Sequence, residues 1–370
     1  MSAQSDAPRS VGTVIVGAGP AGLACALELL RSGVKDVLVV EKHRFPRYKC
    51  CAGYITSKTF ETYKNFGLDP EKCGYSFIED FRLFRGAKER QKIVNKFLYT
   101  SRAIDRVDLD NAFFRLAKDS GVNIEEETEA VSVDREENVL TVRTADGSES
   151  RIKYGNLVFA DGTYGPGSLL QKKRSAKRVN IAMQLIFKSD LPDGIEIRFG
   201  VSRRGYVWVS SYGGVTNVGL TDRFRRGVNY KELFENFMRL RGLTGEGGSA
   251  DDLEQIRKMK AAFTPIGIRK AVVGDNIFFV GDALGACDPL TLSGLRYGLK
   301  SGSAVARSII SGSPSVIKKY AFSLRIRFAF MSLIQRVFYL RPVQFMVFNV
   351  GCRVFGGVIR SAFNRFLVSK

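Results

Sequence analysis

The most constraining feature of the sequence is a glycine fingerprint between a short apolar strand and an apolar helix. Gly17, Gly19 and Gly22 form the pattern GxGxxG, with TVIV at 13–16 before it and a helix expected at 21–32 after it. Glycines at these positions allow a tight turn and let the backbone approach a pyrophosphate at the helix N-terminus. The chain is therefore predicted to open a parallel sheet with a βαβ unit that binds a dinucleotide.

An acidic residue at the end of the second strand supports this interpretation. The buried strand 37–41 (VLVVE) ends on Glu41, 19 residues after Gly22. A carboxylate at that point can accept hydrogen bonds from ribose hydroxyls. Ala21 inside the fingerprint and Lys42 beside the acid complete the predicted site. The alternative is a glycine-rich turn near a surface glutamate, but strand, turn, helix, strand and acid occur in the order that a dinucleotide site requires.

Two further strand ends carry aspartates. Asp161 and Gly162 follow the apolar stretch LVFA, and Gly281 and Asp282 follow FFV. An aspartate at a strand end near a helix N-terminus can hold the hydroxyls of a ribitol chain, directly or through water. Each aspartate taken singly could equally be a helix cap.

The ordered set of motifs resembles the FAD-binding domain of the p-hydroxybenzoate-hydroxylase-like flavoproteins. The resemblance implies that the glycine fingerprint binds the ADP half of FAD and that Asp282 contacts the ribitol and pyrophosphate. Asp161 and Gly162 match a landmark pair of that family. Arg106 and Asp110 match its Arg…Asp pair at the start of a long helix, which implies that Arg106 lies near FAD.

The loop FPRYKCCAG is similar to the Lys-Pro-Cys-Gly-Gly loop of the geranylgeranyl reductases. Lys49 and Cys51 match that loop, whereas Cys50 replaces its proline and Ala52 replaces its first glycine, before Gly53. The resemblance implies that this loop, with Cys51, Ala52 and Gly53, lies at the cofactor. It makes Cys51 a candidate for shaping the ring face or protonating the substrate there, although the cysteine could also be a small buried hydrophobe.

Two strands and one helix extend this resemblance. Residues 206–208 (YVW) and 217–219 (NVG) match the YxWxFP…NVG strands of the geranylgeranyl reductases, but the FP is missing. Tyr206 and Trp208 are therefore expected in the catalytic site, lining the substrate sheet; the alternative for bulky strand residues is the core. The segment 287–302 matches the loop and helix that face the isoalloxazine. It implies cofactor contacts by Pro289, Ser293, Gly294 and Leu295.

The pattern of elements predicts an α/β chain with interleaved domains. A Rossmann-like FAD-binding domain is expected from three segments, residues 11–76, 100–165 and 266–312. Alternating apolar and polar residues predict a mixed β-sheet substrate domain from residues 77–99 and 166–265. Residues 313–370 are predicted to form a basic, amphipathic, helical C-terminal tail.

The net charge of the chain limits the classes of partner that it is expected to bind. The sequence has 57 Lys and Arg against 37 Asp and Glu, a net charge of +20. Such an excess favours an anionic partner. Nucleic acid is disfavoured, because the sequence shows no nucleic-acid-binding motif and much of the charge lies among apolar residues.

The tail suggests what that anionic partner is. Residues 321–370 hold seven Arg, one Lys and no acid, together with many phenylalanines. This composition is typical of a helix that lies in a membrane interface. The alternative is a helical cap over the substrate domain, and a tunnel wall that also touches lipid combines the two. No segment has the roughly 20 apolar residues of a membrane span, so a cytoplasmic protein bound peripherally to an anionic membrane is expected.

Metal chemistry is not expected. His43 is the single histidine, which excludes a site with two histidines from this chain. The six cysteines form no CxxC pair, so a zinc ribbon is not indicated. Their scatter suits a reducing cytoplasm.

The resemblance implies an FAD-dependent reductase that saturates C=C bonds of a prenyl, geranylgeranyl-type chain on an isoprenoid lipid. One alternative is an FAD-dependent hydroxylase or halogenase of an apolar substrate, although the WxWxIP motif of halogenases is not present. Another is a lipid-binding flavoprotein without catalysis. No second dinucleotide fingerprint is visible, so the electron donor is either NAD(P)H at a transient site or a protein such as ferredoxin.

Overall fold

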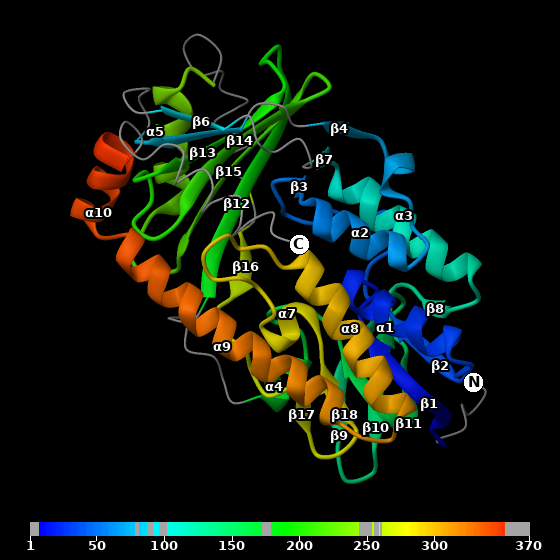
Figure 1. The fold of residues 1–370 in the computed structure, drawn as a ribbon. Helices are drawn as coiled ribbons and strands as arrows, with labels where there is room; N and C mark the ends of the chain where they lie inside the picture. Colours follow the sequence, from blue (N-terminus) through cyan, green and yellow to red (C-terminus); the bar gives the residue numbers. More distant parts are fainter. Residues whose placement is uncertain are drawn as a thin grey trace.

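The computed structural model describes residues 7–77, 81–86, 92–95, 102–171, 179–243, 254, 259 and 261–351. Two β-sheet lobes share one interface, and a long C-terminal helix runs along both of them (Figure 1). The described helices are α1 (Pro20–Arg31), α2 (Ser57–Asn65), α3 (Arg106–Asp119), α4 (Gly167–Leu170), α5 (Tyr230–Leu240), α7 (Gly281–Leu284), α8 (Leu295–Ile310), α9 (Ser315–Phe338) and α10 (Arg341–Phe345). A 3₁₀ turn at Pro70–Cys73 and a π-helical turn at Met346–Gly351 complete the set.

The first lobe is built on a parallel sheet. Its strands are β1 (Arg9–Val16), β2 (Val37–Val40), β8 (Asn123–Glu125), β9 (Thr128–Asp134), β10 (Val139–Thr144), β11 (Glu149–Phe159), β17 (Val272–Val273) and β18 (Ile277–Phe279). The order β18-β11-β1-β2-β8 is parallel throughout, and β9, β10 and β17 join by antiparallel pairing. The apolar ends of the central strands are fully buried, as expected for parallel strands covered on both faces.

The second lobe is a mixed sheet. Its strands are β5 (Phe81–Arg85), β6 (Lys92–Asn95), β12 (Val179–Lys188), β13 (Gly194–Phe199), β14 (Tyr206–Tyr212), β15 (Val215–Arg223) and β16 (Ala262–Pro265). The order is β16-β12-β15-β14-β13-β5-β6, and only the pairing of β5 with β13 is parallel. Helix α5 covers one face, where Phe234 and Phe237 pack among apolar strand residues. The other face is left for the interface between the lobes.

The alternating stretch near residue 77 is divided between two sheets. Strand β4 (Tyr75–Phe77) pairs with β7 (Arg102–Ile104), which also pairs with β3 (Tyr54–Ile55). Strand β5 instead joins the mixed sheet. Alternation predicts that a strand is half-buried but carries no information on which sheet it joins.

Helices α1, α8 and α9 tie the lobes to the tail. A Cβ on Gly302 of α8 would overlap the carbonyl oxygen of Ala21, which shows how closely α8 packs on α1. Helix α9 buries Ile317, Leu324 and Phe328 in the core of the first lobe. Within the described residues, no helix has both the length and the apolar character needed to cross a bilayer. The expected α/β class, with a Rossmann-like lobe, a mixed sheet and a helical tail, is confirmed, although residues 352–370 of the tail lie outside the described part.

Candidate cofactor and substrate site

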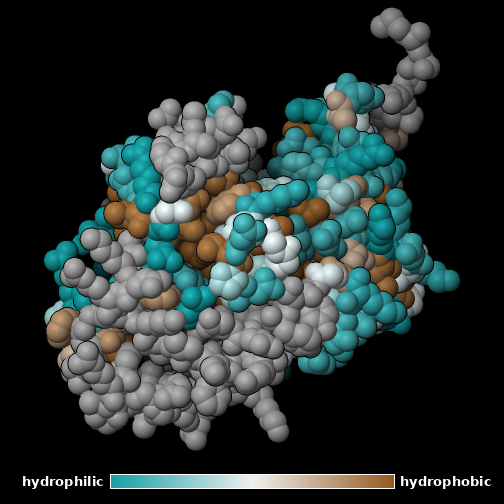
Figure 2. Space-filling model, turned by 90° about the horizontal axis from the view of Figure 1, so that it is seen from above, coloured by the Kyte–Doolittle hydropathy of each residue, from teal (hydrophilic) through white to brown (hydrophobic). Residues whose placement is uncertain are grey.

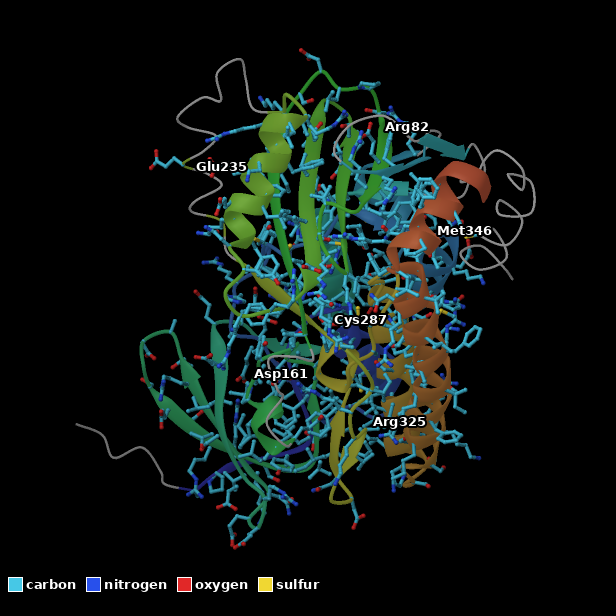
Figure 3. All side chains as sticks on the ribbon, turned by 90° about the vertical axis from the view of Figure 1, so that its left-hand side faces the viewer. Arg82, Asp161, Glu235, Cys287, Arg325 and Met346 are labelled. Atoms are coloured by element: carbon cyan, nitrogen blue, oxygen red, sulfur yellow. The ribbon has the colours of Figure 1, made fainter. Side chains whose placement is uncertain are left out.

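A cavity of about 1100 Å³ lies between the two sheet lobes. Its wall includes the glycine turn, the cysteine loop, the inner face of the mixed sheet and the C-terminal helices. Asp161 and Cys287 mark this junction in the side view (Figure 3). Seen from above, apolar side chains are exposed in the middle of the molecule between hydrophilic areas (Figure 2).

The glycine fingerprint forms one end of the cavity. Gly17 has φ +106°, and its amide donates to the carbonyl oxygen of Val40 at 2.8 Å, where strand β2 ends. Gly19 is the N-cap of α1 and lines the cavity with Gly17 and Ala21. Gly22 is not in the cavity wall; it lies behind the turn, where a Cβ would overlap the carbonyl oxygen of Gly17. Two glycines of the motif therefore face the ligand space and the third allows the turn to close.

Glu41 sits beside this turn. Its side chain is 5% exposed, and its two carboxylate oxygens accept from the amides of Ala18 at 2.8 Å and His43 at 3.0 Å. These amides fix the carboxylate at the cavity wall, where it can accept from a ribose. Lys42 is exposed at the rim of the same cavity.

Arg47 belongs to this group but carries no sequence motif. Its Nε lies 4.0 Å from Glu41 Oε1, and its guanidinium lies over the Phe45 ring at 4.9 Å. A Cβ on Gly19 would come within 3.3 Å of Arg47 Nη2. The buried Nε has no hydrogen-bond partner among the described residues. A guanidinium held against a glycine turn in this way suits a phosphate group.

Asp161 provides an unsatisfied acceptor in the cavity wall. Its Oδ2 accepts from the amide of Gly167 at 2.7 Å, while its buried Oδ1 has no partner within the described chain. Burial raises the pKa of this carboxyl to about 6. Buried acceptors are normally hydrogen-bonded, so a hydroxyl of a bound cofactor would complete this site. Gly162 lines the cavity next to it.

Asp282 and the start of α8 form the opposite side. Asp282 lies in the first turn of α7 with its Oδ2 3.7 Å from Lys49 Nζ. The preceding Gly281 has φ +56° and donates from its amide to Ser301 Oγ at 2.9 Å. Gly294 is the N-cap of α8 and supplies no side-chain cap. An uncapped helix N-terminus facing a cavity favours negative charge on a bound group.

Of the four residues expected to contact the cofactor in and after the loop before α8, three line the cavity and one does not. Ser293, Gly294 and Leu295 line the cavity. Pro289 is not in the cavity wall, and its carbonyl oxygen accepts from Gln335 Nε2 of α9 at 2.6 Å. Helix α8 begins only at Leu295, because the amides of Leu290 and Thr291 are held by the Asp288 side chain in a loop. Pro289 therefore connects the loop to the tail.

Cys51 is held by a chain of hydrogen bonds from the mixed sheet. Its amide donates to Gln184 Oε1 at 2.7 Å, and its carbonyl oxygen accepts from Asn217 Nδ2 at 2.9 Å. Trp208 Nε1 donates to Asn217 Oδ1 at 3.0 Å. A Cβ on Gly219 would overlap the Trp208 ring. The YVW and NVG motifs therefore lie on paired strands so that Trp208 and Asn217 together fix the cysteine loop.

Three thiols border the cavity. Cys51 is partly exposed to it, whereas burial raises the pKa of Cys50 to about 12 and that of Cys287 well above the usual range. Cys287 has no signal in the sequence beyond its place in the loop motif. Ala52 lines the cavity, but Gly53 is not in its wall: Gly53 has φ +72°, and its carbonyl oxygen accepts from the amide of Ile104 at 2.9 Å.

Arg106 reaches the cavity from the first turn of α3. Two of its nitrogens donate to the two carboxylate oxygens of Asp110, both at 2.9 Å, and the pair is almost fully buried. A paired buried arginine keeps its charge and its orientation. The Arg106–Asp110 motif thus places a fixed cation in the cofactor end of the cavity.

The substrate end of the cavity is apolar. Tyr206 lies in its wall and donates from its hydroxyl to the carbonyl oxygen of Thr291 at 2.8 Å, and burial raises its pKa, so it stays protonated. The cavity wall supplied by the mixed sheet and the tail contains no charged residue among those described. Its larger apolar members are Leu83, Ile195, Ile197, Phe199, Trp208, Phe263, Ile334, Phe338, Val347 and Phe348. No group of His, Cys, Asp or Glu in the described part of the chain is arranged to hold a metal.

Comparisons with known proteins identify the family of this chain. The family described as "FAD binding domain" matches residues 10–311. A menaquinone reductase from Mycobacterium tuberculosis is 29% identical over 326 residues, which cover 82% of this chain and 77% of that protein. A digeranylgeranylglycerophospholipid reductase from Methanocaldococcus jannaschii is 26% identical over 304 residues, which cover 78% of this chain and 74% of that protein.

Solved structures share the fold. A geranylgeranyl bacteriochlorophyll reductase-like protein from Thermoplasma acidophilum superposes with a TM-score of 0.72 at 18% identity, covering 90% of this chain and 89% of the other. The flavin-dependent brominase Bmp2 superposes with a TM-score of 0.68 at 20% identity, covering 95% and 92%. The fold thus occurs with different chemistries. The family match and the reductase relatives show that the chain belongs to the FAD binding domain family and is an FAD-dependent oxidoreductase related to the geranylgeranyl-type reductases.

Proposed function

We propose that the protein reduces C=C bonds of a prenyl chain on an isoprenoid lipid. The observation that carries this proposal is the shape and chemistry of one continuous cavity. Its cofactor end holds the charged groups, and its other end is walled by aliphatic and aromatic side chains without a charge. A long apolar chain can lie in such a space, whereas a small polar substrate would leave its hydrogen-bonding groups unsatisfied.

The chain's own residues fit FAD along the cofactor end. The glycine turn and Arg47 would hold the pyrophosphate, and Glu41 would hold the adenosine ribose. Asp161 has a free acceptor for a ribityl hydroxyl, and Asp282 also lines the cavity. The N-terminus of α8 would face the flavin ring.

Reduction of an isolated alkene needs a hydride and a proton on neighbouring carbons. Reduced FAD supplies the hydride when it is bound. The thiol of Cys51 is the candidate proton donor, because its loop is fixed by Asn217 and Gln184 at the junction of the two cavity ends. Tyr206 and Trp208 act in this proposal as wall and positioning residues, since both polar atoms are already engaged. The apolar wall keeps water from the reacting atoms.

Two reductase relatives support the choice of substrate class. The names of their substrates, menaquinone and digeranylgeranylglycerophospholipid, both denote compounds with prenyl chains. The brominase neighbour has the fold but leaves the chemistry open. A prenyl lipid is therefore the substrate we assign. The electron donor would be NAD(P)H or a ferredoxin-type protein, and the site of action an anionic membrane surface on the cytoplasmic side, contacted by the tail.

The decisive experiment measures reduction without oxygen. The full-length protein would be incubated anaerobically with dithionite and a digeranylgeranyl glycerophospholipid in detergent, and the lipid would be analysed by mass spectrometry. We expect the lipid mass to rise by two hydrogens for each bond reduced. A product that forms only with oxygen would instead identify a hydroxylase, and one that requires oxygen and halide would identify a halogenase. Bound lipid without any product would identify a carrier.

A further inference from the structure

Helix α9 exposes an apolar stripe. Phe322, Ile326, Phe330 and Leu333 follow one another at intervals of three or four residues, so they share one face. Between 56% and 62% of each side chain is exposed. The opposite face of the helix is buried in the first lobe. Soluble proteins rarely leave a continuous apolar face of this size open.

Four cations from three helices lie together next to this stripe. They are Lys58 of α2, Arg296 and Lys300 of α8, and Arg327 of α9. The Arg327 guanidinium lies 5.8 Å from the centre of the Tyr297 ring, which packs edge-on against Phe328 at 5.2 Å. The pKa of Lys58 is lowered first by burial and then by Arg296, Arg327 and Lys300, so the four charges share one neighbourhood.

This cluster lacks neutralising acids in the described part of the chain. None of the four cations takes part in an ion pair among the described residues, and the buried Nε of Arg296 has no hydrogen-bond partner there. A group of unneutralised cations is unfavourable unless an anion binds to it.

The other edge of the stripe is also basic. Arg325 and Arg336 lie there, and the labelled Arg325 projects from α9 in the side view (Figure 3). The sequence contains no acid between residues 313 and 351. An apolar stripe between two basic edges matches the layers of an anionic membrane surface, where acyl chains lie beneath phosphate groups.

The cavity and this face share one helix. Ile334 and Phe338 follow Arg327 at intervals of seven and four residues and therefore lie on the same side of α9. Both line the substrate end of the cavity. The apolar stripe and part of the wall of the substrate space are thus carried by neighbouring faces of the same helix.

We propose that the α9 stripe and the four-cation cluster together form a surface that binds the phosphate groups and upper acyl region of an anionic lipid bilayer. This inference names the membrane-contacting surface of the proposed function, but it does not depend on the reaction. The stripe would lie in the acyl boundary, and Lys58, Arg296, Lys300 and Arg327 would hold lipid phosphates. The protein would lie on the bilayer rather than cross it.

The test compares charge variants of the full-length protein in vesicle flotation. The vesicles consist of phosphatidylcholine with or without phosphatidylglycerol. We expect Arg296→Gln with Lys300→Gln to weaken binding to the anionic vesicles about 30-fold, because each basic residue contributes about fivefold at such a surface. The matched control is Arg151→Gln with Lys153→Gln, two exposed cations of β11, and it should change the affinity less than about threefold.

A second pair of variants tests the stripe. Phe322→Ser with Phe330→Ser should lower binding to both kinds of vesicle, whereas Leu240→Ser, which alters a 63% exposed leucine of α5, should not. Inorganic phosphate should compete only in the millimolar range, since a free ion lacks the apolar contact. Tight binding of free phosphate would assign the cluster to a soluble ligand and overturn the proposal.

Two further outcomes would contradict it. One is that the Arg296/Lys300 double variant and its Arg151/Lys153 control bind the anionic vesicles equally well. The other is a lipid-free dimer that the stripe variant converts to a monomer, because the stripe would then cover a second copy of the chain. Activity in detergent should stay within about twofold of the wild type for all these variants. If the protein showed no reductase activity, the proposed function would be wrong, but the vesicle-binding test could still be carried out.

Discussion

The indole nitrogen of Trp208 donates to the side-chain oxygen of Asn217 at 3.0 Å, and the amide end of the same asparagine donates to the backbone of the cysteine loop. One buried side chain thus connects the substrate wall to the loop that carries Cys51. Asn217 is 2% and Trp208 3% exposed, so the indole nitrogen has no water to replace the asparagine when it is removed.

We expect Asn217→Ala to lower both stability and activity. It leaves Trp208 Nε1 and the Cys51 carbonyl oxygen without their partners, at a cost of about 2–5 kcal/mol in the free energy of unfolding. A loop that moves by about an ångström should also lower kcat at least about tenfold. The matched control is Asn180→Ala on β12: Asn180 is also buried, but its Nδ2 has no partner among the described residues. Urea unfolding and turnover of the two variants should separate clearly; equal losses would show that Asn217 is ordinary core.

Cys51→Ala should bind FAD normally and lose most of its reductase activity. Cys51 lines the cavity in a loop that is hydrogen-bonded to the mixed sheet, and alanine removes the proposed proton donor with little change in volume. Cys50→Ala should keep activity, because partial burial raises the pKa of its thiol to about 12, which makes it a poor proton donor. Flavin absorbance and product analysis by mass spectrometry measure both effects. The opposite result, with Cys50 essential, would show that the loop was aligned with the wrong register.

Gly19→Ala should separate cofactor binding from folding. Gly19 is the N-cap of α1 with an ordinary φ of −72°, and a Cβ there would meet only the end of the Arg47 side chain. The apoprotein should lose less than about 1 kcal/mol of stability, yet the methyl group would occupy the space for the pyrophosphate, so FAD affinity should fall at least about tenfold. Gly22→Ala should destabilise the apoprotein as well, because its Cβ would overlap the Gly17 carbonyl. Thermal unfolding with and without FAD distinguishes the two.

Asp161 should make the stability of the apoprotein depend on pH. Its folded-state pKa of about 6 lies above the value of about 3.9 expected in the unfolded chain. A raised carboxyl pKa gives stability that is present below about pH 4 and is lost as the pH rises through about 6. Asp161→Asn should therefore gain stability relative to the wild type between those values. Urea unfolding across this range measures the difference, with the exposed Asp190→Asn as control; parallel curves for wild type and Asp161→Asn would contradict the assignment.

Ile334→Trp should shorten the substrate space. Ile334 projects from α9 into the apolar end of the cavity, so a larger ring would take room from the prenyl chain. We expect reduction of long chains to fall at least about tenfold while a shorter prenyl alcohol is still reduced. Val337→Trp, on the exposed side of the same helix, is the control and should leave both substrates unaffected. Equal rates on the two chain lengths would place the substrate elsewhere.

The motifs that could be predicted from the sequence are those in which one short stretch of chain contains all the residues that form the structure. Gly17, Gly19 and Gly22 lie within six residues, and the turn they form is where they were expected. The same is true of the strand ends at Asp161 and Asp282, which both reach the cavity. The expected cofactor, FAD, is confirmed by the family match.

Features that join distant stretches were beyond sequence reasoning. Nothing near Arg47 indicates that its guanidinium returns to the glycine turn, and nothing near Lys58 places it beside Arg327. The expected cofactor contacts of Gly22, Gly53 and Pro289 illustrate the same limit, since motif matches mark residues that shape a loop as well as residues that touch the ligand. These three support the cavity wall from behind or from the side.

One face of helix α9 lines the cavity and another carries the exposed apolar stripe, and this restricts how its sequence can change over time. A point substitution alters a side chain on one face only, so the cavity wall and the stripe can change independently of each other. Inserting or deleting a single residue before Leu333 would turn the rest of the helix by about 100°. Ile334 and Phe338 would leave the cavity wall in the same event that turned Leu333 and Val337 away from the outer face. The length of this helix up to Ile334 is therefore expected to be preserved among related proteins even where its residues are not.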